Sequence, residues 1–238
     1  MRRSVLDVKK KFSDSLKYIQ RNEAVRKRLL LEMTYHSNAI EGSRMTKAET
    51  EMVFNGMSVR GKELFEHLEV VNHKNAMEFI LGDLKPGFKI DKKYLFKLHE
   101  IIMYNFNHKL PGKYRTGQVN LTNTEKALPS FQDVPLRMGK WLQEVNRYGR
   151  DPLKKIALDH YAFESIHPFF DGNGRVGRLV MLTQLLSRGF APAIIRVDDR
   201  YPYYMALNKA DDGDFKNMIQ MTCAAVLWGY EFLFAAAP

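Results

Sequence analysis

The sequence of 238 residues has very little cysteine and no long run of apolar residues. Its single cysteine, Cys223, cannot form an intramolecular disulfide, and a lone thiol of this kind is typical of a core residue in a reducing compartment. The longest apolar stretches, such as residues 179–186, fall short of the roughly 20 residues that cross a bilayer. Residues 1–11 contain charged side chains where a secretory signal would need an unbroken apolar segment. We therefore expect a cytoplasmic protein that neither spans a membrane nor is exported.

Internal repeats, low-complexity linkers and a series of alternating strand patterns are also missing from the sequence. Hydrophobic residues make up 45% of the chain and aromatic residues 12%, which suits a folded protein with one buried core. Apolar positions recur mostly at intervals of three and four, which is the helical period. The sequence therefore predicts an all-α protein. Helices are expected near residues 5–20, 23–41, 46–55, 62–82, 91–106, 131–148, 151–166, 173–188, 201–210 and 214–235.

The helical period fails between residues 110 and 130. Within this segment Val119 and Leu121 alternate with polar neighbours such as Asn120. Alternation of this kind predicts a small β-hairpin over residues 112–122. An ordinary surface loop is the alternative.

A net charge of +10 would suit a partner that carries phosphates. The basic residues lie in short, scattered groups, for example at residues 9–11, 26–28 and 154–155, rather than in one stripe. Without a recognisable DNA-binding motif, this pattern favours solvated helix faces over a nucleic-acid surface. A basic module that binds nucleotides or nucleic acid without catalysis stays open as an alternative function.

The densest group of chemically useful side chains is HPFFDGNGRVGR, residues 167–178. Pro168 disfavours helical backbone at His167, so the preceding helix should end just before the histidine. Gly172 and Gly174 allow the backbone to turn its amide groups inward where the next helix begins, and helix starts of this kind bind anions. The run therefore predicts an anion site between two helices.

Arg175 and Arg178 follow in the first turns of that helix and share one face. The helix dipole opposes a positive charge there by about 0.3–1 kcal/mol, so a negative partner is expected. A triphosphate would satisfy both arginines, and Asp171 would be explained if it held a Mg²⁺ ion bound to the phosphates. His167 would then be the general base that takes a proton from an attacking hydroxyl. Taken singly these residues have ordinary structural explanations, but their joint occurrence indicates a phosphate site.

The same glycines invite a different interpretation. Gly172, Gly174 and Gly177 spell G-x-G-x-x-G, with Asp198 about twenty residues further on, as in the dinucleotide fingerprint. That fingerprint needs a buried strand directly before the first glycine, and Pro168 interrupts the segment in question. We therefore do not expect an NAD site.

Residues 167–178 match the signature H-x-F-x-[DE]-G-N-G-R-x-x-R at every specified position, and the chain thus resembles the Fic family. The resemblance implies a Fic-type helical domain that transfers AMP from Mg-ATP to a Tyr, Ser or Thr hydroxyl of a target protein. It also implies that the same site can remove AMP in some relatives. Self-modification and the formation of homo-oligomers are left open.

The resemblance assigns a role to each residue of the motif. His167 would activate the target hydroxyl and Asp171 would bind Mg²⁺. Arg178 would bind the γ-phosphate. The remaining residues implied to lie against the phosphates are Gly172, Asn173, Gly174 and Arg175. At Gly174 the relatives that transfer a simple phosphate have lysine, so the glycine favours AMP transfer.

A second motif, SNAIEG at residues 37–42, ends a predicted helix. Gly42 is placed as the C-cap, so Glu41 carries its charge at the negative end of that helix. A badly placed glutamate and badly placed arginines in one chain predict a salt bridge, and Ser37 lies on the same helix face, where it could hold the carboxylate. The run resembles the family's inhibitory motif [ST]-x-x-x-E-[GN], in the group whose inhibitory helix is amino-terminal. By that resemblance Glu41 pairs with Arg178 and keeps ATP misoriented, whereas an exposed helix end is the alternative.

The resemblance covers roughly residues 25–225. It divides the chain into an unassigned amino-terminal helix over residues 1–24 and a Fic domain over residues 25–238, with the inhibitory helix at 25–42. The predicted hairpin corresponds to a flap that holds a target segment by strand addition. The residues assigned to target docking are Val119, Asn120 and Leu121.

Two tyrosines fall where the family places an aromatic residue against adenine. Either Tyr203 or Tyr204 would stack on the base, although core packing explains such residues nearly as well. Asp211 stands where some relatives have asparagine, so the sequence leaves base specificity open.

Overall fold

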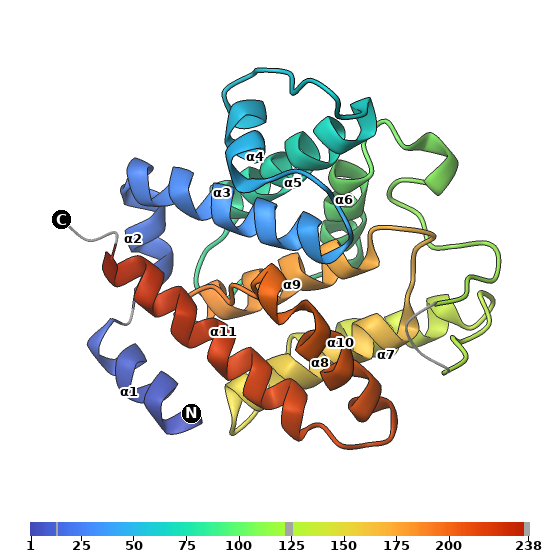
Figure 1. The fold of residues 1–238 in the computed structure, drawn as a ribbon. Helices are drawn as coiled ribbons and strands as arrows, with labels where there is room; N and C mark the ends of the chain where they lie inside the picture. The colour runs from blue at the N-terminus through green and yellow to red at the C-terminus, as the bar shows by residue number, and fades with distance from the viewer. Residues whose placement is uncertain (13, 122–125, 236–238) are drawn as a thin grey trace.

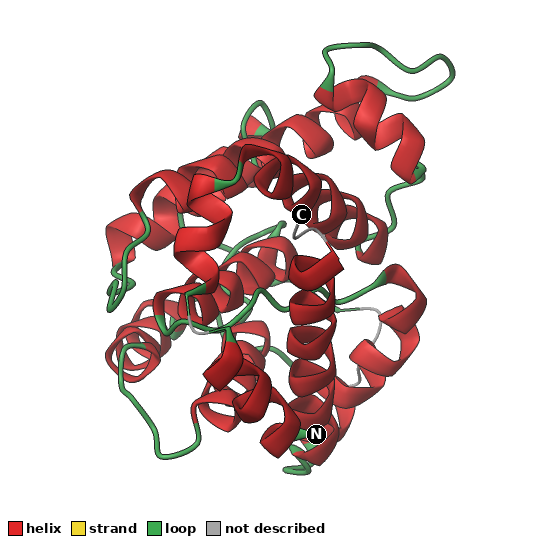
Figure 2. Ribbon diagram, turned by 90° about the vertical axis from the view of Figure 1, so that its left-hand side faces the viewer, coloured by secondary structure: helices red, strands yellow, loops and turns green. Residues whose placement is uncertain are grey.

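The computed structural model describes residues 1–12, 14–121 and 126–235. In this part of the chain every regular element is a helix (Figure 2), which confirms the all-α prediction. The helices are α1 (Arg2–Lys11), α2 (Ser15–Arg21), α3 (Glu23–Ile40), α4 (Lys47–Phe54), α5 (Leu64–Asp83), α6 (Lys92–Ile102), α7 (Val134–Val145), α8 (Pro152–Ile166), α9 (Asn173–Ser187), α10 (Arg200–Asp211) and α11 (Lys216–Ala235), with short 3-10 turns η1 (Asn107–Lys109) and η2 (Val197–Asp199).

Several helices begin and end where the sequence supplies capping residues. Asn22 accepts a hydrogen bond from the amide of Val25 (3.1 Å) and caps α3. Asp151 likewise accepts from the amide of Lys154 (3.1 Å) at the start of α8. Each cap satisfies an amide that has no partner within its helix. At the other end of α3, Gly42 has a φ of 101°, the left-handed conformation predicted for it.

The single helix expected over residues 5–20 is two helices. Asp14 accepts a hydrogen bond from the amide of Lys17 (3.2 Å), which caps α2 and sets it apart from α1. α1 packs against α11, and α2 packs against α3, α5 and α9. Residues 1–24 thus share the core of the remaining chain. The buried side chains that they contribute to it are Val5, Leu16 and Ile19.

α9 runs through the centre of the molecule, with α2, α3, α5, α6 and α8 packed around it (Figure 1). Every residue of this helix except Gly174 is buried. A helix enclosed on all sides has no solvent face to which charged side chains can turn. Arg175 and Arg178 must therefore find their partners inside the protein.

α11 is long and apolar enough to cross a bilayer by length and composition, with a mean hydropathy of 1.3. This corrects the sequence-based statement that every apolar stretch is too short. Half of that helix window is buried inside the fold, where α11 packs against α1, α8 and α10. Its Cys223 is fully buried, and burial raises the pKa of the thiol to about 11, as expected of a core cysteine.

The β-hairpin prediction is wrong for the residues that the structure describes. Residues 112–121 form turns and irregular loop rather than strands (Figure 2). Thr122, the last residue of the expected hairpin, lies outside the described part. The physical reason is a buried arginine in this loop, Arg115, which takes backbone carbonyls inside and outside the loop, at residues 117, 129 and 167, as its acceptors.

Candidate active site

A cleft of about 360 Å³ opens where the loop before α9 meets α8, α10 and the end of α3. It contains most of the residues that the sequence singled out. Those that line it are His167, Asp171, Gly172, Asn173, Gly174, Glu41, Tyr203, Tyr204, Asn120 and Leu121. The fold thus brings both sequence motifs and part of the predicted flap to one place.

His167 lies at the turn between α8 and α9. The helix before it ends at Ile166, as predicted, and His167 takes the left-handed conformation with φ 49° and ψ 63°. A residue other than glycine in this region costs about 1–3 kcal/mol, so neighbouring contacts must hold it there. Arg115 supplies two of them. Its Nε donates to the carbonyl of His167 (2.9 Å), and its amide donates to the carbonyl of Pro168 (2.9 Å).

Arg115 is only 2% exposed, and sequence analysis missed it. Its two terminal nitrogens donate to the carbonyls of Gly117 (3.2 Å) and Pro129 (2.5 Å). One guanidinium therefore ties the predicted flap to the histidine loop. Arginine is usually exposed, so the sequence contained no signal for this role.

The imidazole of His167 is neutral at physiological pH. Burial lowers its pKa to about 4. Nδ1 is buried in the protein, which leaves Nε2 as the ring nitrogen that can face a hydroxyl in the cleft. A neutral imidazole with one ring nitrogen open to the cleft is the state that a general base requires.

The start of α9 has the backbone arrangement that the predicted anion site requires. The first hydrogen bond of the helix runs from the amide of Val176 to the carbonyl of Gly172 (3.0 Å), so the amides of residues 173–175 precede it. Gly172 has a φ of 75°, and a Cβ there would lie 2.8 Å from Sδ of Met103. The side chain of Asn173 is bonded to both backbone groups of Phe169 (2.9 Å each), which closes the loop. Asn173 can thus offer a phosphate its backbone amide, not its side chain.

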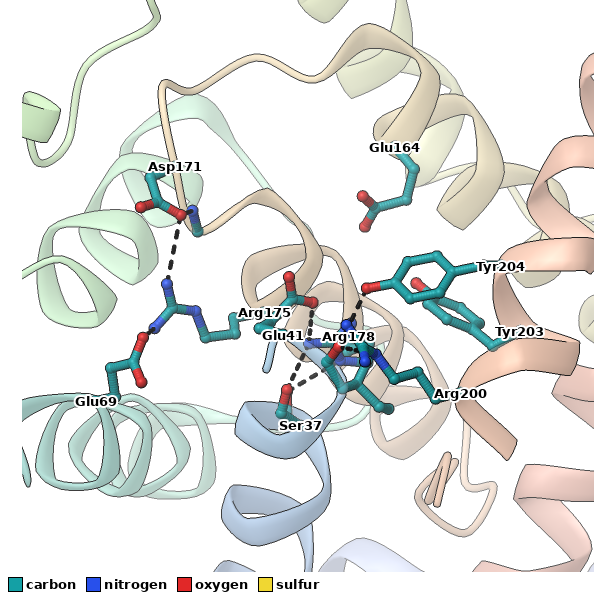
Figure 3. A network of polar contacts seen from close by, with 12 residues as sticks. Ser37, Glu41, Glu69, Glu164, Asp171, Arg175, Arg178, Arg200, Tyr203 and Tyr204 are labelled. Atoms are coloured by element: carbon teal, nitrogen blue, oxygen red, sulfur yellow. Dashed lines mark hydrogen bonds and ion pairs between the residues drawn. The ribbon is translucent and has the colours of Figure 1, made fainter. Parts of the chain in front are cut away.

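Asp171 lies beside this helix start with its carboxylate 44% exposed. Oδ1 accepts from the amide of Gly172 (2.6 Å) and lies 3.5 Å from Nη2 of Arg175, and Oδ2 lies 3.7 Å from Nζ of Lys109. Arg175 also donates to Oε1 of Glu69 (3.0 Å), as Figure 3 shows. Arg175 is buried and does not line the cleft. It therefore contacts Asp171 from the interior of the protein and is not placed to bind a phosphate in the cleft.

The described residues contain no cluster of three or more His, Cys, Asp or Glu side chains that would hold a metal by themselves. Mg²⁺ commonly binds one or two carboxylates and completes its shell with water and substrate phosphates. Asp171, a partly exposed carboxylate next to an anion site, fits that arrangement. The donor set is therefore suited to a Mg²⁺ ion that arrives with a phosphorylated ligand.

Glu41 and Arg178 form the predicted ion pair. Nη2 of Arg178 donates to Oε1 of Glu41 at 2.7 Å (Figure 3), and the arginine side chain is only 6% exposed. Gly174 makes this approach possible, because a Cβ there would lie 2.3 Å from Oε1 of Glu41. The expected bond from Ser37 to Glu41 is wrong. Ser37 instead accepts from Arg178, through Oγ (3.0 Å) and through its carbonyl (2.9 Å).

The two arginines of the motif therefore do not converge on one ligand, although they are three residues apart. Arg175 turns toward α5, and Arg178 turns toward α3 (Figure 3). Each arginine has a carboxylate in the lining of the cleft, Asp171 for Arg175 at 3.5 Å and Glu41 for Arg178 at 2.7 Å. Arg175 is also held by Glu69, whereas Glu41 is the only carboxylate among the described residues that pairs with Arg178, so a phosphate that displaced Glu41 would gain the Arg178 guanidinium.

The two tyrosines differ in their surroundings. Tyr203 is 1% exposed, and its hydroxyl is bonded to Nε2 of His160 (2.8 Å), so it is mainly a core residue. Tyr204 is half-buried, and its hydroxyl donates to the carbonyl of Ile40 (3.2 Å). Further along the cleft, Asp211 accepts from the hydroxyl of Tyr161 (3.0 Å). Tyr204 is thus the better placed of the two for contact with a base.

Sequence analysis also missed residues that complete the cleft. Glu164 lies in the last turn of α8, three residues before His167, and this closeness in the sequence could have drawn attention to it. Burial raises the pKa of the Glu164 carboxyl to about 8. The other lining residues that were missed are Lys126, Leu128, Tyr161, Ser165, Phe170, Arg200, Leu207 and Asn208.

The fold and the site together define a class: an all-α domain in which one helix start, one carboxylate and one neutral histidine face a cleft of nucleotide size. Comparison with known proteins assigns the chain to a family with this kind of domain. Residues 89–185 match the Fic/DOC family, and the chain belongs to that family.

The relatives are protein adenylyltransferases. The chain is 36% identical over 191 residues to "Protein adenylyltransferase Fic" of Nematostella vectensis, covering 78% of this chain and 44% of that protein. It is 33% identical over 215 residues to the protein of the same name in Drosophila erecta, covering 87% of this chain and 43% of that protein. The chain thus spans less than half the length of these curated relatives.

Solved structures share the fold. A fragment of Fic-1 from Caenorhabditis elegans superposes with a TM-score of 0.84 at 25% identity, covering 99% of this chain and 71% of that one. A Fic domain containing signaling protein from Bacteroides thetaiotaomicron superposes with a TM-score of 0.80 at 19% identity, covering 96% and 97%.

Proposed function

We propose that this protein is an adenylyltransferase that moves AMP from Mg-ATP onto a Tyr, Ser or Thr hydroxyl of a target protein. The observation that carries the proposal is the convergence of His167, Asp171 and the start of α9 on one cleft. The names of the curated relatives support the reaction type. The glycine at position 174 supports AMP over simple phosphate, because it leaves the helix start open.

The residues of the cleft account for each part of the reaction. The target oxygen forms a bond to the α-phosphorus, the bond from that phosphorus to the bridging oxygen breaks, and pyrophosphate leaves. The hydroxyl proton passes to Nε2 of His167 and then to solvent. The amides at the start of α9 hold the phosphates, and Mg²⁺ bound by Asp171 would neutralise part of their charge.

We further propose that Glu41 inhibits this activity. Its carboxylate is bonded to the Arg178 guanidinium, which the γ-phosphate would need. It also lies against Gly174 at the start of α9, where the triphosphate would bind. Arg178 can bind one anionic partner at this position at a time. ATP therefore competes with Glu41 or binds with its phosphates misplaced.

The direct test is transfer of label from ATP marked at the α-phosphate to proteins of a cell lysate, compared with ATP marked at the γ-phosphate. Protein labelling by the α-marked nucleotide alone is the expected result. Labelling by the γ-marked nucleotide would indicate a kinase. Binding of Mg-ATP without any transfer would favour a nucleotide-binding module, and removal of label from premodified protein would favour the reverse reaction.

Nucleotide binding should require both Asp171 and Mg²⁺. Without the metal, the carboxylate of Asp171 would repel the phosphates. The variant Asp171→Ala should weaken Mg-ATP binding at least about tenfold, which corresponds to about 1.4 kcal/mol. Calorimetry on the unsubstituted chain should show a similar loss of ATP affinity when EDTA removes the metal. In Asp171→Ala, whose affinity is already reduced, EDTA should lower the affinity little further. Undiminished binding of ATP in EDTA would contradict this role.

Target docking at residues 119–121 is also a proposal, and a backbone variant tests it. Proline at position 119 removes an amide that strand addition would use, so Val119→Pro should reduce modification of targets more than it reduces Mg-ATP binding. Val119→Ala keeps the amide and serves as the control. Equal effects of the two variants would point to side-chain packing. If neither variant has an effect, residues 119–121 are part of an ordinary surface loop.

A further inference from the structure

Glu164 has a place in the cleft that the proposed transfer reaction does not use. It lies in α8, and its carboxyl group points toward Glu41 and Arg178 (Figure 3). Its side chain is 12% exposed, and Oε1 is buried without a hydrogen-bond partner among the described residues. A buried polar atom of this kind costs folding free energy. Because Oε1 has no accessible surface although Glu164 lines the cleft, Oε2 is the carboxyl oxygen left to a ligand bound there.

Two glycines of α9 make room for two carboxyl groups. A Cβ at Gly174 would lie 2.3 Å from Oε1 of Glu41, and a Cβ at Gly177 would lie 2.1 Å from Oε1 of Glu164. The glycines are three residues apart, so they lie next to each other on the helix. Glu164 therefore packs as closely against α9 as Glu41 does. Unlike Glu41, it makes no ion pair with Arg178, whose bonds go to Glu41 and Ser37.

The groups around Glu164 favour its neutral form. Among the described residues, those that face it are Arg178 of α9, Tyr203 of α10, Glu41 at the end of α3 and His160 of its own helix. Burial raises the pKa of Glu164 to about 8, with Arg178 acting in the opposite direction and Glu41 in the same one. His160 brings no charge, because burial lowers its pKa to about 3. A neutral carboxyl group can donate a hydrogen bond, which a carboxylate cannot.

We propose that Glu164 is a nucleotide-binding residue that works as a neutral acid, donating a hydrogen bond from its carboxyl O–H to a phosphate oxygen at the start of α9. The inference rests on the proposed function in one respect, that the ligand is Mg-ATP. A phosphate that replaces the carboxylate of Glu41 keeps a negative charge near Glu164, so the proton stays on. An ionised Glu164 would repel the phosphates. Nucleotide binding is therefore coupled to one proton on this residue.

The test compares Mg-ATP affinity between about pH 7 and about pH 9 in Glu41→Gly and in the double variant Glu41→Gly with Glu164→Gln. The glycine removes the competing carboxylate from both proteins. In the single variant the affinity should fall at least about tenfold, because a group with a pKa near 8 is about tenfold more ionised than neutral one unit above it, and loss of Glu41, which raises this pKa, moves it only downward. In the double variant it should stay constant, since glutamine does not titrate and its amide still donates.

A second measurement does not depend on how well the glutamine variant folds. Calorimetry of Mg-ATP binding near pH 8.5, in two buffers that differ in heat of ionisation, should show net uptake of protons by Glu41→Gly. Uptake that disappears with Glu164→Gln supports the inference. The same pH dependence in both proteins, or no proton uptake, overturns it. So would faster AMP transfer by Glu164→Gln alone, because Glu164 would then be a second inhibitory carboxylate. Failure of every variant to bind Mg-ATP at any pH would instead refute the proposed function.

Discussion

The variant His167→Ala is expected to lose AMP transfer by a factor of about 10²–10⁴ while it still binds Mg-ATP. The histidine is neutral and lines the cleft, but in the proposed reaction the phosphates are bound by the amides of α9 and by a Mg²⁺ ion that Asp171 would hold. Loss of the base should therefore slow the proton transfer from the hydroxyl and leave the nucleotide in place. The measurement is label transfer from ATP beside calorimetric binding of Mg-ATP.

Backbone strain at this residue requires a control. His167 has a φ of 49°, a conformation that asparagine adopts more readily than alanine. His167→Asn should thus keep the loop in place and still lack a base of suitable strength. Equal loss of transfer in both variants, with normal nucleotide binding, supports the general-base role. Loss of nucleotide binding to the same degree as transfer would contradict it.

The variant Glu41→Gly is expected to raise AMP transfer at least about tenfold. Arg178 can face either Glu41 or the γ-phosphate, so removal of the carboxylate frees the guanidinium for ATP. A tenfold change needs about 1.4 kcal/mol, which is well within the effect of breaking a partly buried charged contact. The measurement is the initial rate of self-modification and of modification of lysate proteins.

Two further variants separate inhibition from other effects of the change. Glu41→Gln keeps the shape and an acceptor oxygen but not the charge, so its rate should lie between those of the unsubstituted protein and Glu41→Gly. Arg178→Ala should not activate the protein, because it removes the phosphate partner together with the inhibitory contact. If purified Glu41→Gly transfers AMP at the unsubstituted rate to itself and to lysate targets, the inhibitory role of Glu41 is wrong, whereas the family assignment is unaffected.

The sequence was sufficient for most features that depend on residues close together in the chain. The end of α8 at Ile166 follows from Pro168, two positions later. The turn at Gly172 that begins α9 follows from the glycines on either side of Asn173. The helical period predicted the all-α fold. One local prediction was wrong, the single helix over residues 5–20, because the cap at Asp14 was overlooked.

Other features required the tertiary structure, because they depend on contacts between segments far apart in the chain. The spacing of Arg175 and Arg178 suggested a shared ligand, but a helix enclosed on every side gave each arginine its own carboxylate. Ser37 bonds to Arg178 rather than to Glu41 for the same reason.

The irregular loop around Arg115 also depends on the tertiary structure, because a buried guanidinium takes backbone carbonyls at positions 117, 129 and 167 as acceptors. The protonation state of Glu164 depends on how deeply its carboxyl group is buried, and the spacing of residues along the chain does not indicate this. Local chemistry therefore determined which residues are reactive in this protein. Only the packing of helices around α9 decided which of them meet, and in what state of charge.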